Sequence, residues 1–306
     1  MKSIKTENPF VSIIILNWNG LNVTCEFLDS MRNSTYKNYE IIVVDNGSAI
    51  DPTERIQAGN YYNTKVCRSP VNLGFTGGNN FGMRHASPDY DFIFLINNDA
   101  EITPDLIEKL LEPFYEDPAI GVVCPKIRFH HSPAIIQYAG FNKMNMLTGK
   151  TTAVGSLEAD NGQHDVSGYT HCAHGCAMMV KKEVIEKVGM LAEKFFIYYE
   201  ESDWSARIIR AGYKIYYQAK GLCFHKESIS MGKQSPIKVY FMTRNRILYM
   251  RRNATLLQFL VFISFFNFFT VPKTVFKFLL KKQWKHLKAF INGVTWNLTT
   301  SKKSTF

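Results

Sequence analysis

Two short apolar runs near the start of the chain are each followed directly by polar residues. Residues 11–16 lead into Asn-Trp-Asn-Gly at 17–20, and residues 41–44 lead into Asp-Asn-Gly-Ser at 45–48. Runs that are rich in β-branched residues and apolar on both faces are typical of strands buried in a parallel sheet. Between them, apolar residues recur every three or four positions over 21–35, which is the period of a helix. The pattern predicts a β-α-β unit.

A third apolar run, at 92–96, leads into a pair of asparagines and Asp99, and Pro104 then begins a second helical pattern. Ligands of open α/β sheets bind beyond the carboxyl ends of the strands. We therefore expect an α/β fold in which Asn17, Asp45 and Asp99 converge on one site.

The second half of the chain is less regular. From about 130 to 170 the sequence has no clear period, which indicates a long substrate-facing loop or small strands. Further along, the pattern predicts a strand at 177–180, helices near 182–188 and up to 212, strands near 213–217 and 221–224, and a helix at 236–252.

Charge divides the chain into two unlike parts. The net charge is +10, but residues 1–227 hold 22 Lys and Arg against 26 Asp and Glu. Residues 228–306 hold 14 Lys and Arg, no acidic residue and 15 aromatic residues. A nucleic-acid-binding protein usually carries its basic face on the folded domain that contacts the polymer. The split instead favours an acidic catalytic or binding body, which we place at 1–235, with a basic helical extension at 236–306, and it argues against nucleic acid as a partner.

The extension contains an apolar stretch at 256–271, which is short for a membrane span of about 20 residues. Arg251 and Arg252 precede it and Lys273 and Lys277 follow, and positive charge at both ends opposes leaving either end outside the cell. The aromatic and Lys residues beyond are typical of interfacial helices on anionic lipid. We expect peripheral or monotopic association with the cytoplasmic face of the cell membrane. The alternative is a helical bundle that packs on the catalytic domain.

Two residues at strand ends are candidates for binding a metal. Asp99 ends a buried strand with amides beside it, and a carboxylate fixed there suits a hard divalent cation held mostly by oxygens of a bound phosphate ligand. His225 likewise follows an apolar strand. The alternatives are that Asp99 only ends the strand or caps the next helix, and that His225 is structural.

Cysteine spacing offers a second, weaker metal signal at 171–176, where Cys172 and Cys176 are interleaved with His171 and His174. No second Cys/His pair follows at zinc-finger spacing, so packing is favoured over zinc. The six cysteines form no dense framework, which indicates a reducing compartment.

A glycine- and asparagine-rich segment at 72–80 leads into a helix. Glycines let backbone amides approach a ligand and a helix N-terminus favours anions, so Asn72, Gly74 and Gly78 are candidates for binding a diphosphate or ribose. The spacing fits neither the P-loop nor the dinucleotide fingerprint, which weakens kinase, ATPase and dehydrogenase interpretations. The alternative is an ordinary tight turn.

Carboxylates follow an aromatic segment at the start of a predicted helix. Residues 195–199 are Phe-Phe-Ile-Tyr-Tyr, and Glu200, Glu201 and Asp203 come next. A carboxylate held against aromatic rings can acquire the raised pKa that a general base needs, which makes Glu201 a candidate for this role. The alternative for Asp203 is compensation of the helix dipole or pairing with Arg207 one turn later.

Together these segments resemble family 2 glycosyltransferases of the GT-A fold, in particular the rhamnosyltransferase-like branch. The resemblance covers about 10–250 and rests on the segments 11–20, 42–48, 72–80, 97–99, 195–203 and 240–245. It implies a Rossmann-like mixed sheet flanked by helices. The chain departs from the family pattern in having Glu201 where Asp is commoner, and in keeping only the final acid of a DXD motif at Asp99.

The resemblance also implies a role for each candidate residue. Asp99 and His225 would bind Mg²⁺ or Mn²⁺ on the diphosphate of a nucleotide sugar, and Glu201 would be the catalytic base. The residues expected to bind the nucleotide-sugar donor are Asn17, Asn19, Asp45, Asn72, Gly74, Gly78, Asn98, Asp203 and Arg244.

The implied reaction is an inverting transfer of a sugar from a UDP- or dTDP-sugar to a hydroxyl of an oligosaccharide or lipid-linked glycan in cell-surface polysaccharide synthesis. One alternative is a nucleotidyltransferase that makes the sugar nucleotide, although it would want a glycine-rich loop with Arg and Lys at 17–20. Another is a degenerate, membrane-bound scaffold that binds glycans. The sequence leaves open whether the chain forms a homo-oligomer.

Overall fold

A computed structural model describes residues 8–226 and 235–304, and in these residues a ten-stranded mixed sheet has the main order β3-β2-β1-β4-β9-β6-β10-β5. β7 pairs with β6, and β8 pairs with β10. The strands are β1 (Val11–Asn17), β2 (Tyr39–Asn46), β3 (Thr64–Ser69), β4 (Phe92–Ile96), β5 (Ala100–Ile102), β6 (Ile120–Phe129), β7 (Ser132–Tyr138), β8 (Gly168–Thr170), β9 (Ala177–Lys181) and β10 (Lys214–His225).

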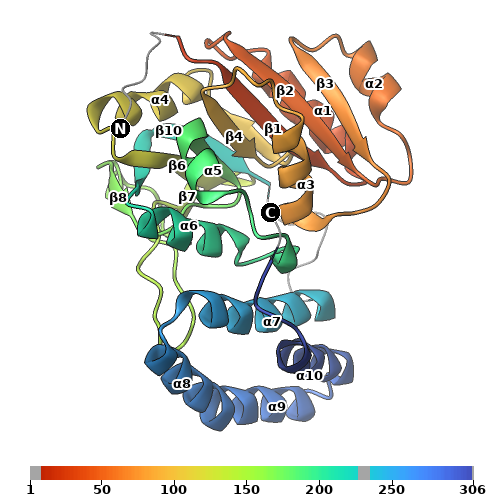
Figure 1. Cartoon of the computed structure of the whole chain (residues 1–306). Coiled ribbons are helices and arrows are strands. Elements are labelled where there is room, and N and C mark those ends of the chain that lie inside the picture. Colours follow the sequence, from red (N-terminus) through yellow and green to blue (C-terminus); the bar gives the residue numbers. More distant parts are fainter. Residues whose placement is uncertain (1–7, 227–234, 305–306) are drawn as a thin grey trace.

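Helices flank this sheet, and a separate group of helices lies below it (Figure 1). The helices of the body are α1 (Leu21–Met31), α2 (Thr53–Ala58), α3 (Gly74–Arg84), α4 (Leu106–Glu116), α5 (Lys182–Val188), the 3₁₀ turn η1 (Glu193–Phe195) and α6 (Glu200–Arg210). The extension consists of α7 (Pro236–Asn253), α8 (Leu256–Phe265), the π-helical η2 (Phe266–Thr270), α9 (Val271–Leu280) and α10 (Trp284–Thr299). The expected mixed α/β architecture with a helical extension is confirmed.

The first half of the sheet is parallel, as predicted. β1 pairs with β2 on one side and with β4 on the other, and β3 follows β2. Every residue of β2 and β4 is buried, which is why these strands are apolar on both faces. The register places Asn17 opposite Asp45, so the polar ends of β1 and β2 meet at one edge.

The second half brings distant residues together through antiparallel pairs. β9 runs antiparallel to β4, and β5 pairs antiparallel with the end of β10. In that pairing His225 lies opposite Ala100, which directly follows Asp99. The two strands expected near 213–217 and 221–224 are one strand, β10, because the ladder with β6 continues through an irregularity between Gln218 and Leu222.

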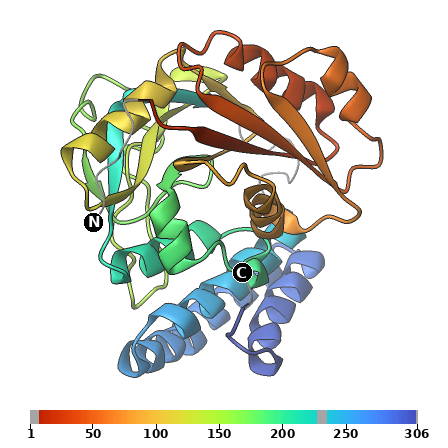
Figure 2. The ribbon, with the colours of Figure 1, turned by 45° about the horizontal axis from the view of Figure 1, so that its top comes forward.

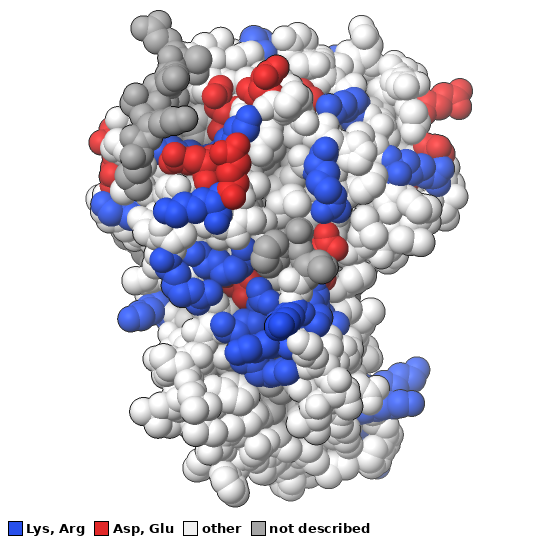
Figure 3. Space-filling view, in the orientation of Figure 1, with Lys and Arg blue, Asp and Glu red and all other residues white. Residues whose placement is uncertain are grey.

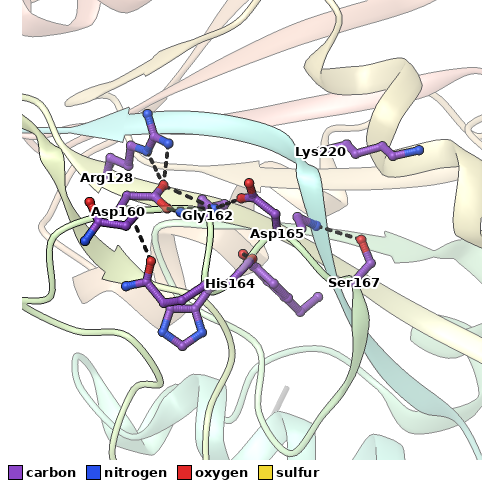
Figure 4. A network of polar contacts seen from close by, with 12 residues as sticks. Arg128, Asp160, Gly162, His164, Asp165, Ser167 and Lys220 are labelled. Atoms are coloured by element: carbon purple, nitrogen blue, oxygen red, sulfur yellow. Dashed lines mark hydrogen bonds and ion pairs between the residues drawn. The ribbon is translucent and has the colours of Figure 1, made fainter.

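The region from 130 to 170 contains β7, β8 and a long ordered loop rather than unstructured chain. A buried ion network fixes the loop to the sheet (Figure 4). The carboxylate of Asp160 accepts hydrogen bonds from Arg128 and from the buried Lys126, whose Nζ lies 3.1 Å from Oδ2. Burial alone would raise the pKa of Asp160, but these hydrogen bonds hold it below its ordinary value. The same loop accepts a hydrogen bond from the Tyr199 hydroxyl at the Gly149 carbonyl, at 2.9 Å, and it reaches the extension, where Arg246 of α7 donates to the Thr148 carbonyl.

The extension has its own apolar core. Its largest buried members include Phe262, Phe266 and Phe290, and Phe195 and Tyr199 of the body join the same cluster. α7 and α10 pack against each other below the body in both ribbon views (Figure 2). α7 begins at Pro236, close to the expected boundary, but the packing crosses that boundary.

One long helix in the extension differs from the expectation. The apolar stretch is not limited to 256–271, because the helix Leu256–Leu280 is continuous for 25 residues through η2. Pro272 is tolerated because it lies in the first turn of α9 and follows the π-helical segment. By length and composition this helix could cross a membrane, and only 11% of its apolar window is buried.

Candidate active site

A cavity of about 900 Å³ lies beyond the carboxyl ends of β1 and β4, between the sheet, the start of α6 and the first turns of α7. The predicted residues that line it are Asn19, Asn72, Gly74, Asn98, Asp99, Glu201 and His225. Segments far apart in the sequence therefore meet at one edge of the sheet. A site was predicted at this edge from the polar residues that follow the strands.

Asp99 and His225 face each other across the pairing of β5 with β10. His225 Nε2 lies 3.1 Å from Asp99 Oδ1, yet this buried oxygen accepts no hydrogen bond. His225 Nδ1 lies 2.9 Å from Oε1 of Gln137, an acceptor, and in the neutral tautomer that donates from Nδ1 to Gln137 the lone pair is on Nε2. Asn97 Nδ2 lies 3.3 Å from Nε2, so a cation bound at Nε2 would replace this contact. Asp99 Oδ1 and His225 Nε2 thus face the same small space.

This arrangement fits a divalent cation. An unpartnered carboxylate oxygen beside an imidazole lone pair is a disfavoured contact unless a positive charge lies between them. Gln137 orients the ring from behind, as partners of metal-binding histidines do. Among the described residues, no three His, Cys, Asp or Glu side chains are grouped for a metal, so oxygens of a bound ligand would complete the coordination.

The ends of β1 and β2 form a hydrogen-bonded support behind the cavity. Asn17 Nδ2 donates to Asp45 Oδ1 at 2.9 Å, and Arg68 Nε donates to Asp45 Oδ2 at 2.9 Å. Asp45 is fully buried and neither it nor Asn17 lines the cavity. Asn19 does line it, with a left-handed backbone (φ 52°). Asn17 and Asp45, expected to contact the donor, therefore position the 17–20 loop instead.

Asn98 and the segment that leads into α3 also line the cavity. Asn98 Nδ2 donates to the Thr24 hydroxyl at 2.8 Å, and Asn72 Oδ1 accepts from the Gly74 amide at 2.8 Å. Gly74 has φ +72°, and a Cβ there would lie 2.5 Å from the Phe196 ring, so glycine is required. Gly78 faces inward, where a Cβ would lie 3.1 Å from Asn46 Nδ2 and from Leu16. Its smallness permits packing of α3 on the sheet, and it does not line the cavity.

Glu200 and Glu201 begin α6 and both line the cavity. Burial, reinforced by the neighbouring Glu201 charge, raises the pKa of Glu200 well above its ordinary value. Burial also raises the pKa of Glu201, although a hydrogen bond from Glu200 partly opposes this shift. The larger upward shift is that of Glu200, so Glu200 is the more readily protonated of the two neighbouring carboxyl groups.

Asp203 and Arg244 lie outside the cavity, contrary to the expected donor contacts. The fully buried Asp203 carboxylate accepts from Arg207 at 3.0 Å, which confirms the alternative pairing, and from Arg252 at 2.8 Å. The Arg244 guanidinium donates to the carbonyls of Lys194 and Phe195. The side chains of both residues are engaged in hydrogen bonds within the protein that join α7 to the body.

Several residues that line the cavity were not predicted as site residues, among them Trp18, Lys238 and His174. Trp18 is 42% exposed and offers a ring to the cavity, and Lys238 on α7 offers a cation, 5.6 Å from the Tyr198 ring centroid. His174 is half-buried and stacked on Phe141, and desolvation lowers its pKa to about 3. Lys238 and Phe241 are three residues apart and therefore lie on the same face of α7. This spacing could have indicated which side of the helix faces the cavity.

The cysteines of the 171–176 segment pack in the interior of the body, and no metal-binding group of three or more His, Cys, Asp or Glu side chains occurs in the part of the chain that the structure describes. Cys172 and Cys176 are buried free thiols, and the Cys176 amide donates to Nδ1 of His174 at 3.1 Å. That bond leaves His174 with its proton on Nε2, as a neutral hydrogen-bond donor.

Comparison with known sequences places the chain among sugar-transferring enzymes. Residues 12–189, more than half of the chain, match the profile described as glycosyl transferase family 2. The chain is 28% identical over 250 residues to a low-salt glycan biosynthesis hexosyltransferase, Agl10, of Haloferax volcanii, covering 78% of this chain and 74% of that protein. It is 23% identical over 232 residues to an N-acetylglucosaminyl-diphospho-decaprenol L-rhamnosyltransferase of Mycobacterium tuberculosis, covering 68% of this chain and 73% of that protein.

Solved structures share the fold. A mannosyltransferase from Pyrobaculum calidifontis, solved with GDP-Man and Mn²⁺, superposes with a TM-score of 0.60 at 14% identity, covering 96% of this chain and 88% of that one. The 1–349 portion of S. aureus TarS, solved with UDP-GlcNAc, gives a TM-score of 0.59 at 16% identity, covering 93% of this chain and 81% of that one.

Proposed function

Because the chain belongs to glycosyl transferase family 2, we propose that it transfers a sugar, with inversion, from a UDP- or dTDP-sugar to a hydroxyl of a lipid-linked glycan. The observation that carries the proposal is that Asp99 with His225 and Glu200 with Glu201 face the same cavity of about 900 Å³. A pair that can bind a cation would stabilise the departing diphosphate, and a carboxylate of raised pKa would accept the proton of the attacking hydroxyl.

In this proposal Glu201 accepts the proton of the acceptor hydroxyl as that oxygen attacks the anomeric carbon of the donor. The proton has a place to go because burial raises the pKa of Glu201. Asp99 and His225 would hold Mg²⁺ or Mn²⁺, which supplies Lewis-acid stabilisation of the departing diphosphate. Lys238 adds a positive charge at the cavity wall, in the role that the sequence suggested for Arg244.

The donor lies against the loops that carry Asn19, Asn72 and Gly74, with Asn98 between them and Asp99. Trp18 offers a surface on which a nucleotide base or a sugar ring can stack. The name of the Haloferax relative, a glycan biosynthesis hexosyltransferase, supports a role in building glycans, and the diphospho-decaprenol substrate named for the Mycobacterium relative supports a lipid-linked acceptor.

The extension supports a membrane location. Leu257, Leu260, Phe268 and Phe276 are more than half exposed along the helix Leu256–Leu280, while Phe262 is buried against the rest of the extension. Lys and Arg gather at the waist between body and extension, and the lower end of the molecule shows little charge on this face (Figure 3). An apolar face with basic surroundings suits in-plane, monotopic binding to an anionic, cytoplasmic membrane surface, where a lipid-linked acceptor would lie.

A donor panel tests the proposal. Purified chain is incubated with UDP-, dTDP- and GDP-sugars and Mn²⁺, and release of nucleoside diphosphate is measured with and without glycan-lipid acceptors. We expect turnover with at least one UDP- or dTDP-sugar, loss of turnover in Asp99→Ala, and near-normal turnover in Glu101→Ala. Glu101 is a suitable control because its carboxylate lies two residues further along and contacts His130 instead. Turnover only from sugar phosphate and nucleoside triphosphate would support a nucleotidyltransferase instead.

A further inference from the structure

The turn that precedes the catalytic carboxylates has an unusual backbone. Phe196 (φ 64°, ψ −57°), Tyr198 (φ 70°) and Tyr199 (φ 71°) all have positive φ, and none is glycine. The Ile197 amide donates to the Phe195 carbonyl at 2.7 Å, which closes a γ-turn centred on Phe196. Such conformations cost free energy for bulky side chains and persist only where their surroundings hold them.

Asn245, on α7, holds this turn. Its Nδ2 lies within hydrogen-bonding distance of the carbonyls of Phe195 (2.9 Å), Ile197 (2.7 Å) and Tyr198 (2.8 Å), and the residue is fully buried. Arg244 Nε donates to Asn245 Oδ1 at 2.8 Å, which fixes the orientation of the amide. Asn245 thus supplies a donor for the Ile197 and Tyr198 carbonyls, and it contacts the Phe195 carbonyl together with the Ile197 amide and Arg244.

The other side of the turn contacts the donor-binding loop. The Phe196 ring fills the space beside Gly74 and stacks on Phe241 with ring centroids 5.2 Å apart. The Thr76 amide donates to the Phe196 carbonyl at 3.1 Å. The turn is therefore held between α7 and the loop before α3, and Tyr199, its last residue, is the N-cap of the helix that begins with Glu200 and Glu201.

We propose that Asn245 is a positioning residue for catalysis: it holds the strained 195–199 turn in the conformation that directs Glu201 into the cavity. The catalytic part of this inference rests on the proposed function, in which Glu201 is the proton acceptor. Asn245 does not line the cavity, so it acts through the turn and not on the substrate. It follows that α7 is part of the catalytic unit, and that the extension does more than attach the protein to a membrane.

A pair of asparagine variants tests this inference. Asn245→Ala removes the amide that holds the turn. Asn297→Ala is the matched control, because Asn297 on α10 is also buried and donates to two carbonyls, those of Arg244 and Gly293, without touching the turn. Melting temperature, donor KM, kcat, the pH profile of kcat and amide hydrogen exchange of the 195–201 segment are compared.

We expect Asn245→Ala to lower kcat about 100-fold, as displacement of a catalytic group does, with donor KM changed less than about threefold. The acid limb of its pH profile moves to lower pH because Glu201 loses part of its burial, and exchange in the turn rises. Asn297→Ala lowers the melting temperature but keeps kcat, pH profile and exchange in the turn close to those of wild type.

Equal kcat in the two variants, at comparable melting temperatures, would overturn the proposal. Asn245→Ser, which keeps one short donor, should give an intermediate kcat; if neither Asn245 variant folds, the side chain stabilises the whole fold and the positioning role is rejected. A wild-type chain without turnover would instead refute the proposed function, and the exchange comparison would still show whether Asn245 fixes the turn.

Discussion

The Asp203 carboxylate on α6 lies 2.8 Å from Nε of Arg252 at the end of α7, and both side chains are largely buried. Nδ2 of Asn253 donates to the same carboxylate at 2.8 Å, and Arg207 does so at 3.0 Å. This cluster joins the catalytic body to the extension through charge-assisted hydrogen bonds.

Removal of this carboxylate should destabilise the protein strongly. Asp203→Ala leaves buried guanidinium groups without their anion, and we expect the free energy of unfolding to fall by about 3–5 kcal/mol. Urea denaturation measures the change. Asp29→Ala, which breaks an exposed pair with Arg32, serves as the control and should unfold like wild type. A loss for Asp203→Ala as small as the control's would show that the cluster does not join the two parts.

The same carboxylate predicts how stability depends on pH. Burial alone would raise the pKa of Asp203, but Arg252, Arg207 and Asn253 hold it below the ordinary value of 3.8. Its contribution is therefore complete above pH 3.8 and is lost as pH falls through the lower pKa of the folded state. The stability difference between wild type and Asp203→Asn should shrink only in that acid range; a difference that already shrinks near neutral pH would contradict the assignment.

Metal affinity should depend on Gln137, which does not touch the metal position. Gln137 fixes the tautomer of His225 by accepting from Nδ1 at 2.9 Å. Gln137→Leu should weaken Mn²⁺ binding about 10- to 100-fold in calorimetric titrations with UDP present. Gln163→Leu, in the surface loop, is the matched control and should bind like wild type. Unchanged affinity in Gln137→Leu would exclude His225 Nε2 as a ligand.

Much of the first half of the chain could be predicted because its buried parallel strands are apolar on both faces and end in polar residues. The convergence of Asp99 and His225 was expected only through the family resemblance, because no local sequence pattern encodes the pairing of β5 with β10 that brings them together. The direction of Arg244 could not be inferred, because residues 243–250 of α7 are all buried and the helix has no single apolar stripe to show which face meets the body.

The length of the apolar helix was underestimated for a different reason. Lys273 and Lys277 interrupt the hydropathy of the sequence after 271, whereas the backbone continues as a helix to Leu280. The predicted segment ended at 271 because polar residues follow, but the backbone hydrogen bonds of the helix continue beyond that point.

Membrane binding should depend on the exposed apolar residues of this helix. Leu257→Glu with Leu260→Glu places two charges on the exposed face, and we expect flotation with phosphatidylglycerol vesicles to be lost. Val166→Glu, at an apolar residue 85% exposed on the catalytic body, is the control and should float like wild type. Equal flotation of both proteins would place the membrane contact elsewhere.

The proton acceptor is tested most directly by single-turnover sugar transfer in Glu201→Gln, with saturating donor and Mn²⁺. The account predicts a rate about 10²- to 10⁴-fold below wild type, with donor affinity unchanged, because the amide retains the shape of the carboxylate but cannot take the proton. Glu183→Gln, outside the cavity at the start of α5, should transfer at the wild-type rate. Wild-type transfer by Glu201→Gln would contradict the central claim.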